Sequence, residues 1–250
     1  MTGAAAAEAR NGATRVRLLV EFPELAQDLR PTATVEAVGA LVAPVERLEP
    51  GSWQPPSRPP AELGLLVLDG YLTRTVLIDG SGCGELLGRG DLLYPWSTAE
   101  GDPSLPLEVE WNVLEPTRLV HLDDCASAAA ARWPSVAGRL AEHAVRRTEN
   151  LASHLAIVCL PGLELRLYAL LWHLADRFGH VQAEGVVIPV RLTHETLARL
   201  VGSRRPSVTT SLSRLRKRGL VGTRGEGWWI AGGRPHPLPA SARRQPLARS

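Results

Sequence analysis

The chain has 250 residues, 44% of them hydrophobic and 22% charged, with a formal net charge of +2. This composition is ordinary for a folded protein, and the length allows one or two domains with a substantial core. No stretch reaches the roughly 18 uninterrupted apolar residues of a membrane helix, and the Ala-rich start lacks the apolar core of a secretory signal. We therefore expect a cytoplasmic protein that is not anchored in a membrane. Reduced thiols are expected at Cys83, Cys125 and Cys159, which are too scattered for a disulfide framework or a zinc site.

The charge is distributed unevenly along the chain. Residues 1–160 hold 13 arginines against 21 acidic residues, a net charge of −8, whereas residues 161–250 hold 15 basic against 5 acidic residues, a net charge of +10. This change of sign predicts two parts with different partners. The basic part favours a polyanion, either nucleic acid or an acidic membrane surface.

The N-terminal region is predicted to mix short elements with loops. Residues 1–13 are Ala/Gly-rich and expected to be disordered. Apolar spacing over residues 16–29 favours short helical segments, which Pro23 interrupts. Residues 38–45 are predicted to form a strand, and the Pro-rich run 54–60 is predicted to be an extended loop.

Residues 63–122 have the pattern of short strands with regular turns. The strand-like runs 65–68 and 71–78 are separated by Asp69-Gly70, a hairpin signal. Further turns are expected at Asp79-Gly80 and Gly90-Asp91, and a further strand at 119–122. The run 107–113 alternates, which places four apolar residues on one face: Leu107, Val109, Trp111 and Val113. Such spacing predicts a small barrel or sandwich.

Helical periodicity follows. A short helix is expected over residues 126–132, and a long one from Pro134 to about Cys159, where Pro161 and Gly162 stop it. A second copy of the long helix would cover its apolar stripe, although packing on the chain's own strands is the alternative. The predicted dimer contacts are Val136, Leu140, Ala144, Leu151, Leu155 and Val158. An amphipathic helix over residues 162–178 and a short strand at 186–190 come next.

Residues 192–219 carry the most informative pattern. Thr193 is a good N-cap, and Glu195 in the first turn suits the helix dipole. Gly202 breaks this helix, and a second helix follows with Pro206 in its first turn and Gly219 at its end. The inward-facing residues are expected to be Leu197, Ala198 and Val201 in the first helix and Val208, Leu212 and Leu215 in the second. Two short helices joined by a glycine turn predict a helix-turn-helix, with an ordinary structural hairpin as the alternative.

The second helix, about residues 205–218, is predicted to enter the major groove of double-stranded DNA. An arginine can bond guanine bidentately, worth about 1–3 kcal/mol of discrimination. Residues 222–230 are consistent with a wing, in which Trp228 and Trp229 pack. The basic tail 233–250 is expected to be disordered. The predicted DNA-binding residues are Thr193, His194, Arg204, Arg205, Pro206, Ser207, Thr209, Thr210, Ser213, Arg214 and Arg224.

The runs 192–202 and 204–210 resemble the Crp/Fnr family of bacterial transcription regulators. The resemblance extends to residues 166–178 and, more weakly, to 86–92, and spans about residues 15–232. It implies an α+β fold that begins with a jelly-roll-like, cyclic-nucleotide-binding-like β-roll as sensory domain. The implied segments are a β-roll at 14–125, a dimerisation helix region at 126–160 and a winged helix-turn-helix at 161–232.

The resemblance also implies a homodimer that binds DNA, with RNA polymerase as a further partner. By position, Arg205 matches the family's base-reading arginine and Ser207 a phosphate-contacting hydroxyl. The sequence departs from the family where Pro206 replaces a common Glu and Thr210 replaces a second base-reading Arg. The family's usual half-site is therefore not assumed.

The implied sensory region departs further from cyclic-nucleotide binders. These carry a Gly-Glu and then, after a loop, an Arg-Ser or Arg-Thr that holds the cyclic phosphate. Here Gly90-Asp91 is followed by an apolar run, and residues 97–110 contain four acidic residues and no arginine. Because a phosphate would meet carboxylates, we expect no tight cyclic AMP binding. No cofactor is predicted, and the effector stays unidentified.

For the residues that other sensory chemistries would use, a structural role is the alternative. A haem could use His121, His143 or His154, but a lone histidine is more often structural. An iron–sulfur cluster needs about four clustered cysteines, and three scattered ones argue against it. A redox switch at Cys83 or Cys159, and an apolar effector beside Tyr94, Trp96 and Trp111, stay open as hypotheses.

The leading function from sequence is a dimeric, sequence-specific DNA-binding regulator. An enzyme on a β-roll is the first alternative, but the sequence has no P-loop, Gly-Xaa-Ser-Xaa-Gly or His-Glu-Xaa-Xaa-His motif. The second alternative is a ligand-sensing or protein-interaction module whose winged helix does not read DNA.

Overall fold

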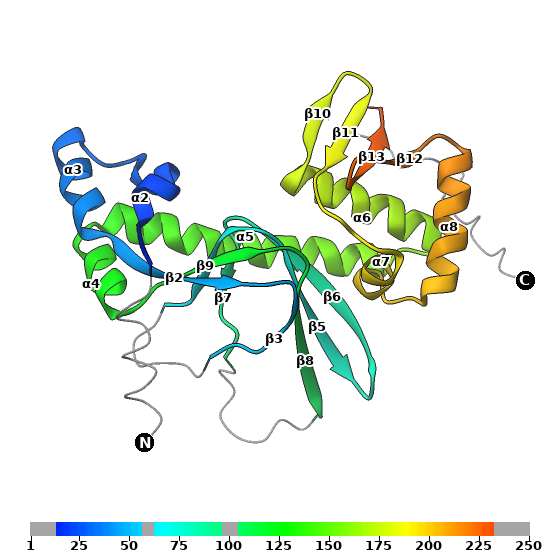
Figure 1. The fold of residues 1–250 in the computed structure, drawn as a ribbon, viewed down its shortest axis with the longest axis horizontal. Coiled ribbons are helices and arrows are strands. Elements are labelled where there is room, and N and C mark those ends of the chain that lie inside the picture. Colours follow the sequence, from blue (N-terminus) through cyan, green and yellow to red (C-terminus); the bar gives the residue numbers. More distant parts are fainter. Residues whose placement is uncertain (1–13, 57–62, 97–104, 233–250) are drawn as a thin grey trace, which may run out of the picture. The chain divides into compact units, whose positions relative to one another are not determined.

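The structure is a computed structural model that describes residues 14–56, 63–96 and 105–232 (Figure 1). The predictions of disorder at both ends, and part of the Pro-rich loop, lie outside these residues. The chain divides into two compact units. The first comprises Met1–Thr73, Leu87–Ser104 and Glu110–Glu149, and the second Arg74–Leu86, Leu105–Val109 and Asn150–Ser250. Among the described residues, no helix is long and apolar enough to cross a membrane.

Short helices precede most of the strands. They are α2 (Leu18–Glu21), the 3-10 helix η1 (Pro23–Ala26) and α3 (Pro31–Ala40). Each of η1 and α3 begins with a proline, which tolerates the first helical turn because its missing N–H has no intrahelical partner there. The strand predicted over residues 38–45 is therefore wrong in its first half, because Val38 lies in α3. The helix ends at Ala40, and the strand begins at Val42.

The strands form two open sheets, so the described residues contain no closed barrel. One sheet has the order β1-β2-β9-β4-β7 and the other β3-β8-β5-β6. The mixed fold with an N-terminal β-sheet region and a C-terminal helix-turn-helix confirms the predicted class. The strands are β1 (Arg15–Arg17), β2 (Val42–Leu48), β3 (Gly51–Trp53), β4 (Leu65–Asp69), β5 (Leu72–Ile78), β6 (Ser81–Leu87), β7 (Leu92–Leu93), β8 (Leu107–Val113) and β9 (Thr117–His121).

The hairpin predicted at Asp69-Gly70 is wrong. β4 pairs with β7 and β9, whereas β5 belongs to the other sheet, so this turn carries the chain from one sheet to the other. Gly70 has φ +82, and a Cβ there would lie 2.3 Å from Thr117 Oγ1, so the turn excludes other residues. The hairpin forms instead between β5 and β6, where Asp79 and Gly80 both have positive φ, as a tight two-residue turn requires.

The alternation predicted for residues 107–113 holds only in part. Trp111 and Val113 are buried, but Leu107 and Val109 are exposed. The core cluster that contains Trp111 includes Val113 and Leu119 but neither exposed residue. An alternating pattern therefore identified the strand but not how much of it is covered.

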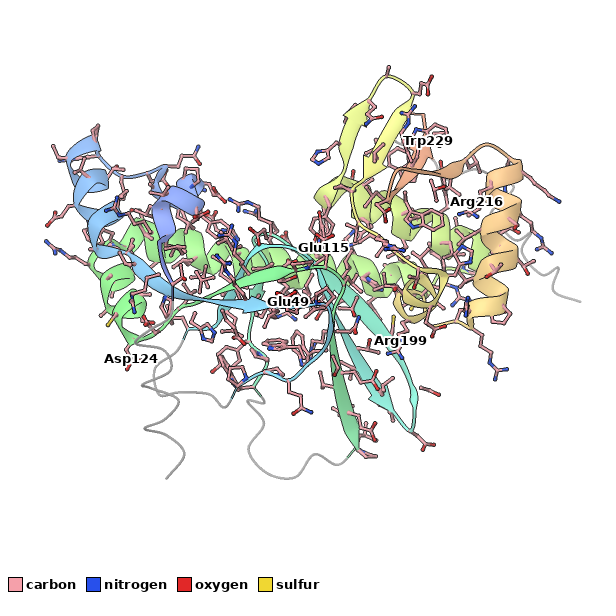
Figure 2. All side chains as sticks on the ribbon, viewed as in Figure 1. Glu49, Glu115, Asp124, Arg199, Arg216 and Trp229 are labelled. Atoms are coloured by element: carbon pink, nitrogen blue, oxygen red, sulfur yellow. The ribbon has the colours of Figure 1, made fainter. Side chains whose placement is uncertain are left out.

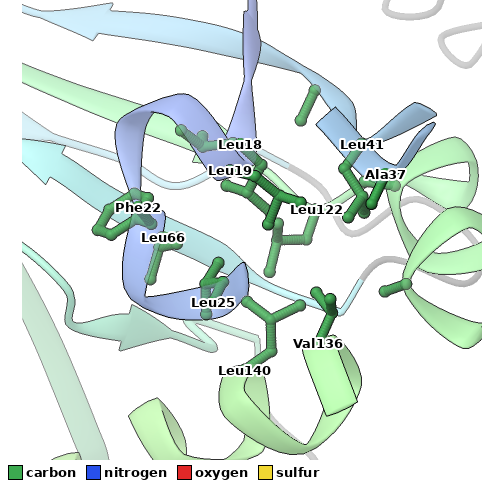
Figure 3. Packing of buried hydrophobic residues seen from close by; sticks show 14 of the residues in the cluster. Leu18, Leu19, Phe22, Leu25, Ala37, Leu41, Leu66, Leu122, Val136 and Leu140 are labelled. Atoms are coloured by element: carbon green, nitrogen blue, oxygen red, sulfur yellow. The ribbon is translucent and has the colours of Figure 1, made fainter. Parts of the chain in front are cut away.

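A second apolar cluster lies between the N-terminal helices and the first half of a long helix. That helix, α5 (Pro134–Val158), matches the prediction closely, and α4 (Asp124–Arg132) precedes it. Asp123 caps α4 by accepting from the Ala126 N–H at 2.9 Å. Figure 3 shows Leu25 of η1 beside Val136 and Leu140 of α5, and all three are buried. Burying a side chain of this size contributes about 1.5–3 kcal/mol.

The C-terminal unit continues with α6 (Leu163–Phe178), which confirms the predicted helix but not its amphipathic character, because nine of its residues are buried and residues 167–172 are buried in succession. Four strands form a further sheet in the order β10-β11-β13-β12. Along the chain, two of these strands precede a pair of helices and two follow it. These elements are β10 (His180–Gln182), β11 (Gly185–Ile188), α7 (His194–Leu200), α8 (Arg205–Lys217), β12 (Val221–Arg224) and β13 (Gly227–Ala231). β10 was not predicted, because its three exposed residues carry no alternating pattern.

Candidate nucleic-acid interface

The helix-turn-helix is built as its sequence predicts. Thr193 caps α7, because its hydroxyl oxygen accepts the Thr196 N–H at 3.0 Å. Gly202 has φ +58, a left-handed conformation that glycine adopts without strain, and it turns the chain between α7 and α8. The predicted inward residues are all buried: Leu197, Ala198, Val201, Val208, Leu212 and Leu215.

The opposite face of α8 is exposed. The predicted DNA-binding residues on and beside it are all exposed: Arg204, Arg205, Pro206, Ser207, Thr209, Thr210, Ser213 and Arg214. Ser211 is buried together with the apolar stripe, which the sequence pattern did not single out. A helix anchored on one face and polar on the other can lie in a DNA groove without exposing its core.

Arg204 and Arg205 stand at the start of α8, as the N-cap and the first residue of the helix. Both are exposed. Within the described ranges, their guanidinium groups make no hydrogen bond or ion pair with another side chain. Each therefore keeps its five N–H donors in the planar arrangement that suits phosphate oxygens or a guanine edge.

Two threonines of α8 bond inside the helix. The Thr209 hydroxyl donates to the Arg205 carbonyl at 3.1 Å, and the Thr210 hydroxyl donates to the Pro206 carbonyl at 3.1 Å. His194 Nδ1 lies 2.9 Å from Thr209 Oγ1 and connects the start of α7 to α8. Because the Thr209 proton is donated to the carbonyl, His194 Nδ1–H donates to the Thr209 oxygen.

His194 is kept neutral by its surroundings. Burial lowers its pKa, and the positive charges of Arg216 and Arg205 lower it further. Its ring centroid lies 6.2 Å from that of Trp228, and the Arg216 guanidinium lies over the same Trp228 ring, 5.1 Å from the centroid. The histidine therefore lies close to positive charges, and a phosphate bound nearby would offset their effect on its pKa.

Arg214 is partly committed to a partner within the chain. Its Nη1 donates to Glu164 Oε1 at 3.1 Å, and Arg218 Nη1 lies 3.6 Å from the other oxygen of the same carboxylate. Glu164 belongs to the first turn of α6. Of the predicted DNA-binding arginines on α8, Arg205 is thus the freer one and Arg214 the more restrained.

The predicted wing is formed by β12 and β13, which pair in an antiparallel hairpin. Arg224 does not extend freely from it, because Nη1 donates to Gln182 at 2.6 Å and Nη2 lies 3.3 Å from Glu184. Trp228 is buried and donates its indole N–H to the Leu192 carbonyl, which confirms its packing role. Figure 2 labels Trp229 in this sheet and Arg216 on α8.

The predicted dimer residues on α5 fall into two groups. Val136 and Leu140 are buried in the chain's own core, so they have no surface left for a partner. Leu151 and Leu155 are 39% and 64% exposed, and Ala144 is also exposed. Val158 is half-buried. An apolar face thus remains on the middle and the end of the helix.

The α7–α8 hairpin and the β12–β13 wing define the region from α6 to β13 as a winged helix-turn-helix, a class of DNA-binding domain. Residues 165–231 match the family model of the Crp-like helix-turn-helix domain. The match is confined to this part of the chain, and there it supports the predicted resemblance to the Crp/Fnr transcription regulators. No curated protein matches the chain.

Solved structures share the fold at low sequence identity. A cyclic nucleotide-binding domain containing protein from Listeria monocytogenes has a TM-score of 0.62 at 14% identity, over 75% of this chain and 88% of that one. A CooA mutant from Carboxydothermus hydrogenoformans has a TM-score of 0.58 at 14% identity, over 83% and 89%. A CRP family transcriptional regulator from Thermus thermophilus has a TM-score of 0.54 at 20% identity, over 75% and 92%.

Proposed function

We propose that the chain is a homodimeric, sequence-specific DNA-binding transcription regulator that places α8 in the major groove. The observation that carries the proposal is the exposed, unpaired state of Arg204 and Arg205 at the start of α8. The buried face of the same helix fixes its position in the unit. Arg205 is assigned the base-reading role, and Ser207 and Arg204 contact phosphates. The cytoplasmic location and a contact with RNA polymerase stay predictions from the sequence.

The dimer is proposed to form through the exposed part of α5. Ala144, Leu151 and Leu155 recur at spacings that place them on one helical face, and a second copy of the helix would cover them. Val136 and Leu140 drop out of this contact, because the chain's own core uses them. A two-fold dimer would present two copies of α8 to half-sites about one helical turn, roughly 34 Å, apart.

The N-terminal unit is proposed not to bind cyclic AMP tightly. The turn at Gly90-Asp91 already satisfies its polar groups, because the buried Asp91 carboxylate accepts the Gly88 N–H at 2.8 Å. His143 Nδ1 lies 2.6 Å from the Gly90 carbonyl oxygen. An N–H that donates to a carboxylate is not free to donate to a phosphate. The negative charge of the carboxylate would also repel the phosphate. Isothermal titration with cyclic AMP should give no heat of binding, and micromolar affinity would refute this assignment.

DNA reading is tested by fluorescence anisotropy with duplexes selected for binding and with a scrambled duplex, at two salt concentrations. We expect affinity to fall steeply with salt, and the selected duplex to bind more tightly than the scrambled one. Arg205→Ala should cost about 1–3 kcal/mol on the selected duplex and much less on the scrambled one.

Arg132→Ala is the matched control, since it removes one exposed arginine from α4, away from the helix-turn-helix in sequence. It should leave both affinities unchanged. If the wild-type chain binds neither duplex, the winged helix is a protein-interaction or ligand-sensing module instead. If Arg205→Ala weakens both duplexes equally, Arg205 contacts phosphate and does not read a base.

A further inference from the structure

The β5–β6 hairpin reaches the helix-turn-helix inside the C-terminal unit, which contains both residues 74–86 and 150–250. The Cys83 thiol of β6 donates to the Leu200 carbonyl oxygen, with Sγ 3.2 Å away. His154 of α5 places Nε2 2.7 Å from the same oxygen. Cys83 Sγ and His154 Nε2 are 3.7 Å apart. Leu200 is the last residue of α7, so one carbonyl joins three elements; we call this the Leu200 junction.

The Leu200 carbonyl needs partners from outside its helix. The last four carbonyls of any α-helix lack intrahelical donors, and they are costly to bury unpaired. The carbonyl of the next residue, Val201, also accepts a hydrogen bond from a side chain, because Arg166 Nη1 of α6 donates to it at 3.2 Å. The turn that leads to α8 is thus fixed by side chains from β6, α5 and α6.

The hairpin itself is anchored against this turn. A Cβ on Gly84 would lie 3.7 Å from Leu200 Cδ2, so the β6 backbone packs directly on the Leu200 side chain. At the end of β6, Arg177 Nη1 of α6 donates to the Leu86 carbonyl at 2.8 Å. With two attachments, a movement of the hairpin would displace the end of α7.

Both donors at the junction are neutral. Burial raises the pKa of the Cys83 thiol, and burial lowers the pKa of His154. The thiol therefore keeps the proton that it donates, and the imidazole donates as the Nε2–H tautomer. The charged and titratable groups that act on His154 are Glu85 and Arg177, and the ring of His173 lies 6.4 Å away between centroids. A thiolate here would have no proton to donate and would repel the carbonyl oxygen.

We propose that Cys83 and His154 are positioning residues for DNA reading, which hold the end of α7 through the Leu200 carbonyl and so fix the direction in which α8 leaves the turn. α8 begins at Arg205, directly after this turn. The proposal rests on the proposed function, because it concerns the orientation of the DNA-reading helix. It assigns a functional reason to a half-buried cysteine that is far in sequence from the helix-turn-helix.

Paired substitutions separate the hydrogen bonds from simple packing. Cys83→Ala and His154→Leu remove the donors, whereas Cys83→Ser and His154→Gln keep an O–H or N–H near the same place. Cys125→Ala is the control, because Cys125 is exposed on α4. The full chain is compared for affinity to its selected duplex, and for hydrogen exchange of residues 201–204 without DNA.

We expect Cys83→Ala and His154→Leu to weaken binding about tenfold and to speed exchange in the turn, as loss of a partner for a buried carbonyl predicts. Cys83→Ser and His154→Gln should stay within about twofold of wild type on the same reasoning. Unchanged affinity and exchange in the donor-free variants would overturn the proposal. Equal losses in all four variants would also overturn it, because packing would then be the cause.

Two further outcomes are distinguishable. If the wild-type chain binds no DNA, the proposed function fails, and faster exchange in the donor-free variants would support only a structural junction, which overturns the role in DNA reading. If His154→Leu does not fold, Cys83→Ala carries the test alone, because it removes a single half-buried thiol. A thermal melt of each variant identifies that case.

Discussion

His194 and Thr209 join the two helices of the helix-turn-helix through a hydrogen bond of 2.9 Å between Nδ1 and the hydroxyl oxygen. The bond places a neutral histidine beside Arg205 and Arg216, on the exposed side of the domain where DNA is proposed to lie. Both side chains were predicted to contact DNA. The structure adds that the two side chains are hydrogen-bonded to each other, so a substitution of either one should alter the contact between α7 and α8.

DNA affinity should depend on pH through His194. The pKa of His194 is lowered below its usual 6.5 in the free protein, and nearby phosphates would raise it, so DNA binding would take up a proton. Affinity should then increase as pH falls from about 7.5 to 5.5, by less than tenfold per pH unit because one group titrates. His194→Asn, which keeps a donor near Nδ1, should reduce this pH dependence in anisotropy titrations. His180→Asn is the control, and equal slopes in all three proteins would place His194 away from phosphate.

Glu164 should lower the affinity of the chain for non-specific DNA. Its carboxylate pairs with Arg214 at 3.1 Å and with Arg218 at 3.6 Å. Glu164→Gln removes the negative charge that pairs with Arg214 and Arg218, so affinity for a scrambled duplex should rise. The slope of log affinity against log salt should steepen by up to about 1–2. Stability should change by less than about 1 kcal/mol, because these pairs are partly exposed. A shallower slope would show that the pairs themselves position the arginines for DNA.

The unfolding free energy should fall in mild acid because of His173. Burial and the charge of Arg177 lower the pKa of His173 to about 4 in the folded chain, compared with 6.5 when unfolded. A lowered histidine pKa means that the unfolded state takes up the proton first, so stability is full above pH 6.5 and is lost as pH falls towards 4. With allowance for solvent screening, the loss at pH 5 should be about 1–2 kcal/mol.

Urea unfolding of the wild type and of His173→Gln at pH 7 and pH 5 measures this loss of unfolding free energy. The variant should lose less stability than the wild type between the two pH values. His154 contributes in the same direction, because burial also lowers its pKa, so the wild-type loss includes both histidines. Identical losses in the two proteins would show that His173 is protonated in the folded state.

Two leucines of α5 should respond differently to truncation. Leu140 is buried in the cluster with the N-terminal helices, so Leu140→Ala should lower the unfolding free energy by about 2–5 kcal/mol. Leu155 is 64% exposed, so Leu155→Asp should leave the monomer folded but weaken the dimer. Light scattering across a concentration series, with urea unfolding of both variants, separates the two effects. If Leu155→Asp has the same molar mass in solution as the wild-type dimer, this helix face does not form the dimer contact.

Local sequence signals predicted the helix-turn-helix well, because its caps, glycine turn and inward stripes all lie within about 28 neighbouring residues. The same signals failed at Asp69-Gly70, where the turn residues are right but the strands on either side pair elsewhere. Strand pairing depends on tertiary contacts, which a two-residue turn does not specify.

The Leu200 junction was beyond sequence reasoning for the same kind of reason. Cys83 and Leu200 are 117 positions apart, and Cys83 and His154 are 71 apart. The sequence presents each as an isolated residue, for which a structural role is the default. The restraint of Arg214 by Glu164 is similar, since 50 positions separate the two charges.

In vitro selection of duplexes from a random pool by the full chain, repeated with Arg205→Ala, tests the central claim most directly. The account predicts an enriched two-fold symmetric sequence, with half-sites about 10–11 base pairs apart. It also predicts that Arg205→Ala loses its preference at one base pair of each half-site. A pool without enrichment, or the same enriched sequence from both proteins, would contradict DNA reading by Arg205.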